Sequence, residues 1–287
     1  MRGQKQALTR LISRACRIMK TDRGKDPMSA LSVAIITHNE AARIRACLES
    51  VSWADEIVVV DAESNDETVS ICRDFTDRIF VRPWPGFAKQ KQFALEQCRN
   101  EWVLSLDADE RVRPELAAEI QRVLSAAGPC DGYRLARRSY FIGRWIRHCG
   151  WYPGYQLRLF KKDRTTVSLS RVHEGFLVEG RIGELLGDLD HYSHRSLADS
   201  LEKMNRYSTL EALDRLERGR VRPIDFITHP LSAFFRKYIG RSGYRDGMPG
   251  LLLCWISSLL TMAVYMKRWH WQRSTPAEQQ AARERHW

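Results

Sequence analysis

The sequence predicts an α/β fold with a mostly parallel sheet, and three observations support this prediction. Strand-like and helix-like segments alternate from residue 31 to residue 106. The strand-like segments are nearly continuous apolar runs, as in Ile57–Val60, which is typical of strands that are buried on both faces of a parallel sheet. Acidic side chains follow two of these runs, where the carboxyl ends of parallel strands form the usual ligand-binding rim.

Each element follows from the periodicity of its apolar residues and from its ends. The expected elements are strands at 31–37, 56–60, 78–81 and 102–106 and helices at 41–50, 67–75, 88–98 and 115–124. Thr37 lies three positions before Glu40, and Ser64 lies three before Glu67, which is the spacing of a capping box. Two helices are therefore expected to begin at the rim. After residue 130 strand-like and helix-like segments no longer alternate, which predicts that the rest of the chain has a different role from the parallel sheet.

The composition is that of a globular protein with an anionic partner. Of the 287 residues, 44% are hydrophobic, and 46 Lys and Arg against 35 Asp and Glu leave a formal net charge of +11. Phosphorylated sugars, acidic lipid headgroups and nucleic acid all fit this charge. The seven cysteines are never arranged as CxxC, which predicts a reduced environment and argues against a zinc or disulfide framework. Residues 1–27 are interrupted by charges throughout, so no secretory signal is expected there.

Two acidic clusters follow strands on the predicted rim. Asp107 and Asp109 end the fourth expected strand, and Asp61 opens the run DAESND, which ends at Asp66. Mg²⁺ and Mn²⁺ prefer oxygen ligands and commonly bridge one or two carboxylates to substrate phosphates. Neither GxGxxG nor GxxxxGK is present, which argues against dinucleotide oxidoreductases and P-loop kinases. The rim is therefore predicted to bind a divalent cation, although acidic turns after strands are also common in proteins without one.

Basic side chains surround a rigid turn near the same rim. Arg82, Lys89 and Lys91 flank the sequence PWPG at 83–86. They are expected to approach the phosphates of a ligand, with ordinary exposed charge as the alternative.

Three segments carry a resemblance to a known family. They read LSVAIITHNE at 31–40, IVVVD at 57–61 with SND at 64–66, and LSLDADE at 104–110. These segments resemble the nucleotide-sugar half of family 2 glycosyltransferases, whose fold is called GT-A. The stretch from WADEI through VRPWPGF to LDADER more narrowly resembles the lipopolysaccharide inner-core β-1,4-glucosyltransferase group. The resemblance extends over about residues 30–195.

The resemblance implies a role for each rim residue. The residues expected to bind the donor are Thr37, Glu40, Asp61, Asp66, Lys89 and Asp107. Asp107 and Asp109 are expected to hold Mg²⁺ or Mn²⁺ and, through it, the diphosphate. His38 and the neighbours Ala62 and Glu63 depart from residues that are frequent in the family. UDP-glucose is the donor favoured by the resemblance, and these departures leave other nucleotide sugars open.

Enzymes of this kind invert the anomeric centre by a single displacement, so a general base must take the proton of the acceptor hydroxyl. Glu174, in the sequence VHEG, resembles the acid that the family supplies from its second half. His173 is expected to orient Glu174 or to contact phosphate, with a packed or exposed histidine as the alternative. Asp188 and Asp190 are less favoured bases.

An aromatic and cationic segment, WYPGYQLR at 151–158, suits an acceptor sugar or its phosphates. Trp151, Gln156 and Arg158 are the expected contacts. Alternation along a strand would direct Gln156 and Arg158 from one face toward the same cleft. Core packing is the alternative for Trp151 and Tyr155, because aromatic side chains bury large areas.

Both ends of the chain carry predicted membrane-binding segments. Leu251–Met266 is an apolar run that is shorter than the roughly 20 residues of a spanning helix. The basic residues Arg236, Lys237, Arg241 and Arg245 precede it, and Lys267, Arg268, Trp269, Trp271 and Arg273 follow it. Trp255 lies within the run. We predict an interfacial helix or a half-buried hairpin, with a buried core helix as the alternative. Residues 1–28 form a predicted amphipathic basic extension, or else a solvated tail.

These predictions divide the chain into four parts: the basic extension at 1–28, a nucleotide-sugar-binding half at 29–130, an acceptor-binding half with the catalytic base at 131–225, and a membrane-associating segment at 226–287. The predicted function is metal-dependent, inverting transfer of a hexose from a nucleotide diphosphate sugar to a glycolipid such as the lipopolysaccharide inner core. The enzyme would act at the cytoplasmic face of the inner membrane, as a peripheral protein, with no nucleic acid partner.

Other functions remain as alternatives. The acceptor could instead be another cell-envelope polysaccharide or a lipid-linked glycan. Nucleotidyltransfer or phosphatase chemistry would also use Asp107 and Asp109, but aspartyl phosphatases carry their acid pair on the first strand. A nonenzymatic basic adaptor for membranes or RNA is disfavoured by the intact acids Asp61, Asp107 and Asp109.

Overall fold

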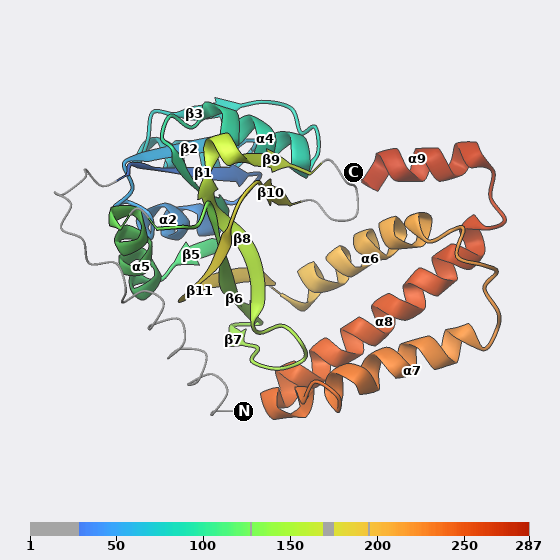
Figure 1. Ribbon diagram of the computed structural model, residues 1–287. Coiled ribbons are helices and arrows are strands. Elements are labelled where there is room, and N and C mark those ends of the chain that lie inside the picture. The colour runs from blue at the N-terminus through green and yellow to red at the C-terminus, as the bar shows by residue number, and fades with distance from the viewer. Residues whose placement is uncertain (1–28, 127, 169–174, 195, 287) are drawn as a thin grey trace.

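The computed structural model describes residues 29–286 apart from 127, 169–174 and 195. The extension predicted at 1–28, and the predicted base Glu174 with its neighbour His173, lie outside the described residues. A large sheet with helices on both faces forms one side of the molecule, and four helices, α6 to α9, lie beside it (Figure 1).

Among the described residues, nine strands form one continuous sheet. Its first part is parallel and has the spatial order β3 (Ile79–Val81), β2 (Glu56–Asp61), β1 (Leu31–Thr37) and β4 (Trp102–Asp107). Its second part continues from β4 with β8 (Gly154–Lys161), β6 (Gly132–Phe141), β11 (Ile182–His194) and β5 (Glu110–Val112), and β7 (Arg144–Trp145) pairs with β6. In this part β6 and β11 are parallel and the other pairs are antiparallel. The four predicted parallel strands are confirmed.

Helices cover both faces of the parallel part, because both faces of its strands are apolar. The elements that cover it are α2 (Ala41–Glu49), α3 (Thr68–Arg73) and α5 (Pro114–Ser125) on one face, and α4 (Phe87–Gln97) with the hairpin of β9 (Thr165–Val167) and β10 (Phe176–Val178) on the other. A short 3-10 turn, η1 (Lys162–Arg164), joins β8 to β9. Ile35 packs against the first set and its neighbour Ile36 against the second. This burial on both sides explains the continuous apolar runs.

The capping-box prediction was wrong for both helices. Helix α2 begins after Glu40 without a side-chain cap, because the Glu40 carboxylate pairs with Arg43 instead, at 2.6 Å between Oε2 and Nε. Helix α3 also lacks a side-chain cap from its own N-cap residue, Glu67. The Asp66 carboxylate accepts from the backbone N–H groups of both Ala41 and Thr68, at 3.1 and 3.0 Å. One aspartate therefore accepts hydrogen bonds from backbone N–H groups at the amino ends of two helices.

The carboxyl-terminal region is helical. It contains α6 (Leu197–Asp214), α7 (Asp225–Tyr238), the 3-10 turn η2 (Gly243–Asp246), α8 (Gly247–Trp271) and α9 (Pro276–His286). Leu251–Met266 lies within the single helix α8, which packs on α6 and α7. Within the described part of the chain, the segment Gly243–Trp271 is long and apolar enough to cross a membrane, and 28% of its most apolar window is buried in the protein. Helix α8 is therefore partly buried and partly exposed, and its binding to a membrane surface stays a prediction.

Three of the predicted basic flanks bind protein rather than solvent. Lys237 donates to the Ser257 hydroxyl at 2.8 Å, and the buried Arg268 reaches the backbone carbonyl oxygens of Arg218 and Gly219. Lys267 donates to α6, at 2.6 Å from the carbonyl oxygen of Asn205. These cations hold the helices together, which the sequence pattern did not reveal.

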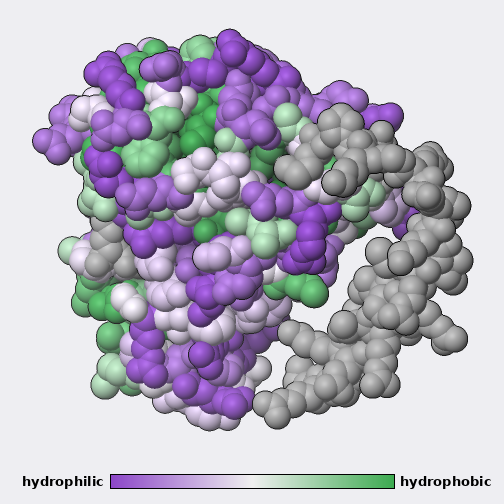
Figure 2. All heavy atoms as spheres, turned by 90° about the vertical axis from the view of Figure 1, so that its left-hand side faces the viewer, coloured by the Kyte–Doolittle hydropathy of each residue, from purple (hydrophilic) through white to green (hydrophobic). Residues whose placement is uncertain are grey.

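An apolar stripe runs along the outside of α7 and α8. Its members are Ile224, Ile227, Leu231, Phe235 and Ile239 at α7, and Met248, Trp255, Leu259, Met262, Met266 and Trp269 on α8, each more than a third exposed. They recur at intervals of three, four or seven residues, which keeps them on one side of each helix. By contrast, the face on the far side of the sheet from α6 to α9 is mainly hydrophilic (Figure 2). We call the α7–α8 set the outer stripe.

Candidate functional site

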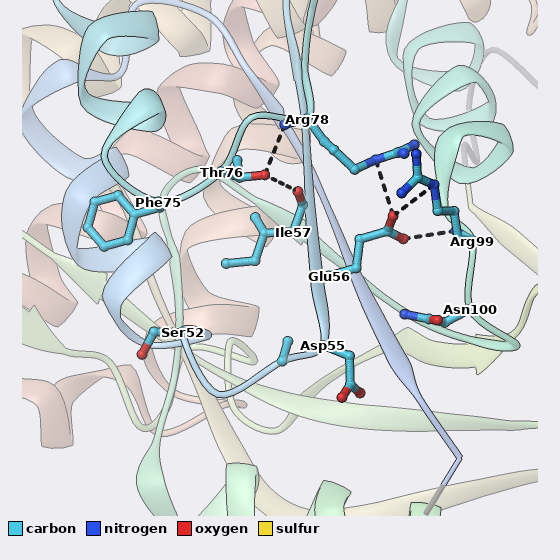
Figure 3. A pocket seen from close by; sticks show the side chains of 10 residues that line it. Ser52, Asp55, Glu56, Ile57, Phe75, Thr76, Arg78, Arg99 and Asn100 are labelled. Atoms are coloured by element: carbon cyan, nitrogen blue, oxygen red, sulfur yellow. Dashed lines mark hydrogen bonds and ion pairs between the residues drawn. The ribbon is translucent and has the colours of Figure 1, made fainter.

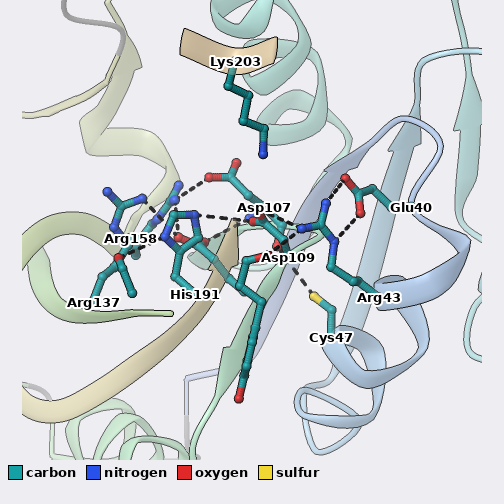
Figure 4. Close-up of polar contacts among 12 residues, drawn as sticks. Glu40, Arg43, Cys47, Asp107, Asp109, Arg137, Arg158, His191 and Lys203 are labelled. Carbon is teal, nitrogen blue, oxygen red and sulfur yellow. Dashed lines mark hydrogen bonds and ion pairs between the residues drawn. The ribbon is translucent and has the colours of Figure 1, made fainter. Parts of the chain in front are cut away.

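Asp107 and Asp109 lie where strand β4 turns into β5, beside the carboxyl end of β1. Arg158 of β8 donates to Asp107, at 2.6 Å between Nη2 and Oδ2, and Lys91 of α4 lies 3.2 Å from the other oxygen (Figure 4). Burial alone would raise the pKa of Asp107, but the charges of Arg158 and Lys91 outweigh it and hold this pKa well below its usual range. Asp107 is therefore an ionised carboxylate with two cations.

Glu110 completes an acidic centre with Asp107 and Asp109. It is fully buried, and its carboxylate accepts from the backbone N–H of Asp107 at 3.0 Å and from Arg158 at 2.6 Å. Arg137 of β6 lies 3.7 Å away. Burial would lower the pKa of Arg158, but Asp107 and Glu110 raise it above its usual value. Arg158 thus bridges two acids and fixes the end of β4 against the second part of the sheet.

Among the described residues, the cations nearest to Asp109 lie further away than those of Asp107. The Asp109 oxygens lie 3.7 Å from Arg43 Nη1 and 3.7 Å from His191 Nε2, and Arg43 is itself bound to Glu40 and to the carbonyl oxygen of Tyr192. Burial, together with the negative charges of Asp107 and Glu110, raises the pKa of Asp109 to about 7. A buried carboxylate in this position is stabilised by any cation that enters the site.

The predicted cation Lys89 is exposed on α4, whereas Lys91, two residues later and therefore on the opposite side of the helix, contacts Asp107. Arg82 stacks on the Phe93 ring, with its guanidinium carbon 4.4 Å from the ring centroid. The structure thus brings Lys91 to the acidic centre and leaves Lys89 and Arg82 outside it.

The first two strands end in side chains that already have partners. Asp61 is fully buried and accepts from the backbone N–H and the hydroxyl of Ser64, at 2.8 and 2.5 Å. Asp66 and Glu40 are bound as described above. The Thr37 hydroxyl, in contrast, is buried at the rim and has no hydrogen-bond partner among the described residues. Of the predicted nucleoside contacts, Thr37 is the one that presents an unused polar atom to a ligand.

A cavity of about 230 Å³ opens beside Asp107, and the predicted acceptor contacts Gln156 and Arg158 both line it, with Arg137 and Tyr155. Arg158 lies in a β-bulge: its neighbours Leu157 and Leu159 pair with consecutive residues of β6, and Arg158 itself has no paired residue there. From this position its side chain contacts Asp107 and Glu110. The alternative interpretation of the two aromatic residues was that they pack in the core. Trp151 does pack against Phe141 in a buried cluster, whereas Tyr155 is 42% exposed and is not a core residue.

A larger cavity, of about 430 Å³, lies at the amino ends of the strands, away from the acidic centre (Figure 3). Its charged groups bind one another: Glu56 lies 3.1 Å from Arg78 and accepts from the Ser32 hydroxyl and from the backbone N–H of Arg99. Because these groups are satisfied and lie far from the rim, the smaller cavity beside Asp107 is the candidate site.

Sequence reasoning missed several members of this site. Glu110 directly follows the DAD sequence, so its position was a usable signal. Arg43 lies one turn after Glu40 on α2, which is the spacing of a helical ion pair. His191 and Arg137 come from strands whose pairing is not readable from local patterns.

Comparison with known proteins supports a family assignment. The family model "Glycosyl transferase family 2" matches residues 32–177. The lipopolysaccharide core biosynthesis glycosyltransferase LpsC of Rhizobium meliloti (strain 1021) is 36% identical over 247 residues, which cover 83% of this chain and 90% of that protein. The uncharacterized glycosyltransferase RT0209 of Rickettsia typhi (strain ATCC VR-144 / Wilmington) is 32% identical over 251 residues, covering 77% and 82%.

Among solved structures, the mannosyltransferase PcManGT from Pyrobaculum calidifontis, in complex with GDP-Man and Mn²⁺, aligns with a TM-score of 0.45 and 16% identity over 96% of this chain and 92% of that chain. The family match and the two relatives confirm the predicted enzyme class, and the mostly parallel sheet with its acidic rim agrees with the predicted GT-A fold. The chain belongs to glycosyl transferase family 2, and it is a glycosyltransferase.

Proposed function

We propose that the enzyme transfers a hexose from a nucleoside diphosphate sugar to a glycolipid of the lipopolysaccharide core, with a divalent cation. The observation that carries the proposal is the acidic centre at the end of β4, where no cation of the described residues lies closer to Asp109 than 3.7 Å. The relative LpsC, a lipopolysaccharide core biosynthesis glycosyltransferase, supports the lipopolysaccharide core as acceptor. UDP-glucose is the donor we would test first.

The side chains of the acidic centre fit Mg²⁺ or Mn²⁺. Within the described residues no three His, Cys, Asp or Glu side chains form a closed metal cage. Ions of this kind commonly bind through one or two carboxylates and complete their shell with waters and substrate phosphates. Asp109 and Asp107 would hold the ion, which would neutralise charge on the diphosphate. Lys91 and Arg158 keep Asp107 ionised for this role.

Transfer with inversion requires one displacement. The acceptor hydroxyl attacks the anomeric carbon, the bond from that carbon to the diphosphate oxygen breaks, and a carboxylate takes the hydroxyl proton. We propose Glu174 as this base, supported by the next two residues, Gly175 and Phe176, which line the cavity beside Asp107. Asp190 is less suited, because Arg113 and Arg138 lie 3.4 and 3.7 Å from it.

The outer stripe fits a membrane surface. Aromatic and aliphatic side chains that are exposed along two adjacent helices suit the boundary between lipid headgroups and acyl chains. Trp255 and Trp269 have the amphipathic rings that favour this depth. We propose peripheral binding of α7 and α8 to the cytoplasmic face of the inner membrane, where a glycolipid acceptor would be presented.

A donor panel tests the proposed reaction. Purified enzyme would be incubated with UDP-, GDP- and ADP-sugars and a lipopolysaccharide core acceptor, with Mn²⁺, with Mg²⁺ or with a chelator. We expect turnover of one donor, lost on chelation, with an inverted anomeric configuration in the product by NMR. Binding of no nucleotide sugar under any of these conditions would refute the proposal.

Membrane binding is expected to depend on the outer stripe. Replacing Phe235 and Trp255 together with Ser should weaken binding to anionic phospholipid vesicles at least about tenfold, because each side chain contributes roughly 1.5–3 kcal/mol when it is buried in an apolar medium. Leu186→Ser is the matched control, since Leu186 is 84% exposed on β11. Vesicle co-sedimentation measures both. Equal loss in the control, or none in the double variant, would contradict membrane docking by α7 and α8.

Metal binding is expected to release a proton below neutral pH. Burial and the neighbouring acids raise the pKa of Asp109 to about 7, so at lower pH the folded protein holds a proton there that the ion must displace. Calorimetric titration with Mn²⁺ and UDP in buffers of different ionisation enthalpy should show about one proton released near pH 6 and almost none near pH 8.5. Asp109→Asn removes this proton, and pH-independent affinity in the wild type would contradict the assignment.

A further inference from the structure

Helix α6 brings one more cation to the acidic centre. Figure 4 shows the Lys203 side chain directed from α6 toward Asp107 and Asp109. Its ammonium group lies 3.3 Å from Asp199, one turn earlier on the same helix, and its side chain is 28% exposed. Lys203 thus approaches the acids from a helix outside the sheet, whereas Arg158, Arg137 and the acids themselves belong to the sheet or its turns.

The position of α6 is fixed from the next helix. The ammonium group of Lys267 of α8 lies within hydrogen-bond distance of four acceptors on α6, which are the carbonyl oxygen and side-chain oxygen of Asn205 and the hydroxyls of Ser208 and Thr209, at 2.6 to 2.8 Å. These contacts begin two residues after Lys203. The helix turn that carries Lys203 is therefore held in place relative to α8.

Two other cations of the site, Arg158 and Arg137, are bound to a buried acid. Arg158 bridges Asp107 and Glu110, and Arg137 faces Glu110, which is fully buried. Moving either guanidinium to a ligand would leave a buried carboxylate unpaired, which is costly. Lys203 pairs with Asp199 in a partly exposed helical ion pair, and such pairs are weak. Exchanging this ion pair for a contact with a phosphate therefore costs little.

The chemistry of the leaving group requires such a cation. A diphosphate that is esterified at both ends carries one negative charge on each phosphorus. When the bond to the sugar breaks, its electron pair stays on the phosphate oxygen, so the terminal phosphate gains a further negative charge. It keeps this charge at neutral pH, because the second pKa of a phosphate ester is about 6. A mobile ammonium on a flexible stem can follow that charge as it develops.

We infer that Lys203 binds the terminal phosphate of the donor and stabilises the charge that develops on the leaving nucleoside diphosphate. This inference rests on the proposed function, since it concerns the same donor. It gives the carboxyl-terminal helices a part in the reaction, because α6 supplies a group that touches the substrate.

Nucleotide binding to the full-length protein tests the inference separately from transfer. UDP, GDP and ADP would be titrated with Mn²⁺ by calorimetry, and the nucleoside diphosphate that binds the wild type most tightly would be compared with its monophosphate. For Lys203→Gln we expect about a tenfold to hundredfold loss of affinity for the diphosphate, the range for a hydrogen bond to a charged group, and a much smaller loss for the monophosphate.

Two further variants complete the test. Lys203→Arg keeps the charge and should bind the diphosphate within about threefold of the wild type. Arg206→Gln removes the same charge from the same helix, at an exposed residue whose described contact is the Tyr207 ring, and should bind like the wild type.

The outcomes separate the two proposals. If the wild type binds no nucleoside diphosphate, the proposed function fails, and this inference with it. If the wild type binds but Lys203→Gln binds equally well, or loses both nucleotides alike, or Arg206→Gln loses as much, the role of Lys203 is refuted and the proposed function stands.

Discussion

Replacing Asp109 with Asn is expected to reduce sugar transfer about a thousandfold while leaving the fold at least as stable as before. The loss follows from removing a charge that would hold the cation at the diphosphate, a contribution of the size seen for groups that stabilise developing charge. Stability is expected to hold, because burial and the charges of Asp107 and Glu110 disfavour an ionised Asp109 in the cation-free protein. Activity is measured with the identified donor, and stability by thermal unfolding without metal.

Asp107→Asn provides the contrast. Asp107 has Arg158 and Lys91 as close partners, so its replacement is expected to lower both transfer and the melting temperature. If Asp109→Asn melted well below the wild type while Asp107→Asn did not, the roles assigned to the two carboxylates would have to be exchanged.

Arg158→Met is expected to lower the free energy of unfolding by about 3–5 kcal/mol, which is the cost of leaving a buried charge without its partner. Arg158 is 4% exposed and Glu110 is fully buried, so water cannot replace the lost guanidinium. For a chain of this size the melting temperature should fall by roughly 6 to 20 °C. Urea unfolding, followed by circular dichroism, measures the free energy directly.

A double variant shows whether the loss comes from the unpaired acid. Adding Glu110→Gln to Arg158→Met removes the charge that the first substitution leaves uncompensated, and should recover part of the lost stability. Equal destabilisation in the single and double variants would show that Arg158 acts through packing alone.

The parallel part of the fold could be predicted closely, because each of its strands and helices is indicated by the pattern of residues within its own short segment. The strand at 31–37 and the helix near 41–49 were predicted within a residue, since apolar runs and turns mark their ends. The second part could not be ordered in advance. Strands β8, β6 and β11 pair across long separations, and which strand lies beside which depends on contacts that no local pattern encodes.

The site shows the same division. Asp107 and Asp109 were predictable because they end a buried strand, and Gln156 and Arg158 line one cavity as predicted. Arg158 was predicted to contact the acceptor, but in the structure it forms ion pairs with Asp107 and Glu110. The sequence could not predict these ion pairs, because the three residues come into contact only when the sheet folds. The capping boxes failed for a related reason, because Glu40 pairs with Arg43 in preference to the backbone.

The sheet that passes from β4 into β8 limits how such an enzyme can be recombined with its relatives. A crossover near residue 130 would take β4 and β5 from one parent and their partners β8 and β11 from the other, so two strand pairs would join sequences that are not matched to each other. A crossover after β11 cuts no strand pair of the sheet, so the helices from Leu197 onward form the natural unit of exchange. Chimeras joined there would keep the acidic centre of one parent while taking the outer stripe, together with the residue at position 203, from the other.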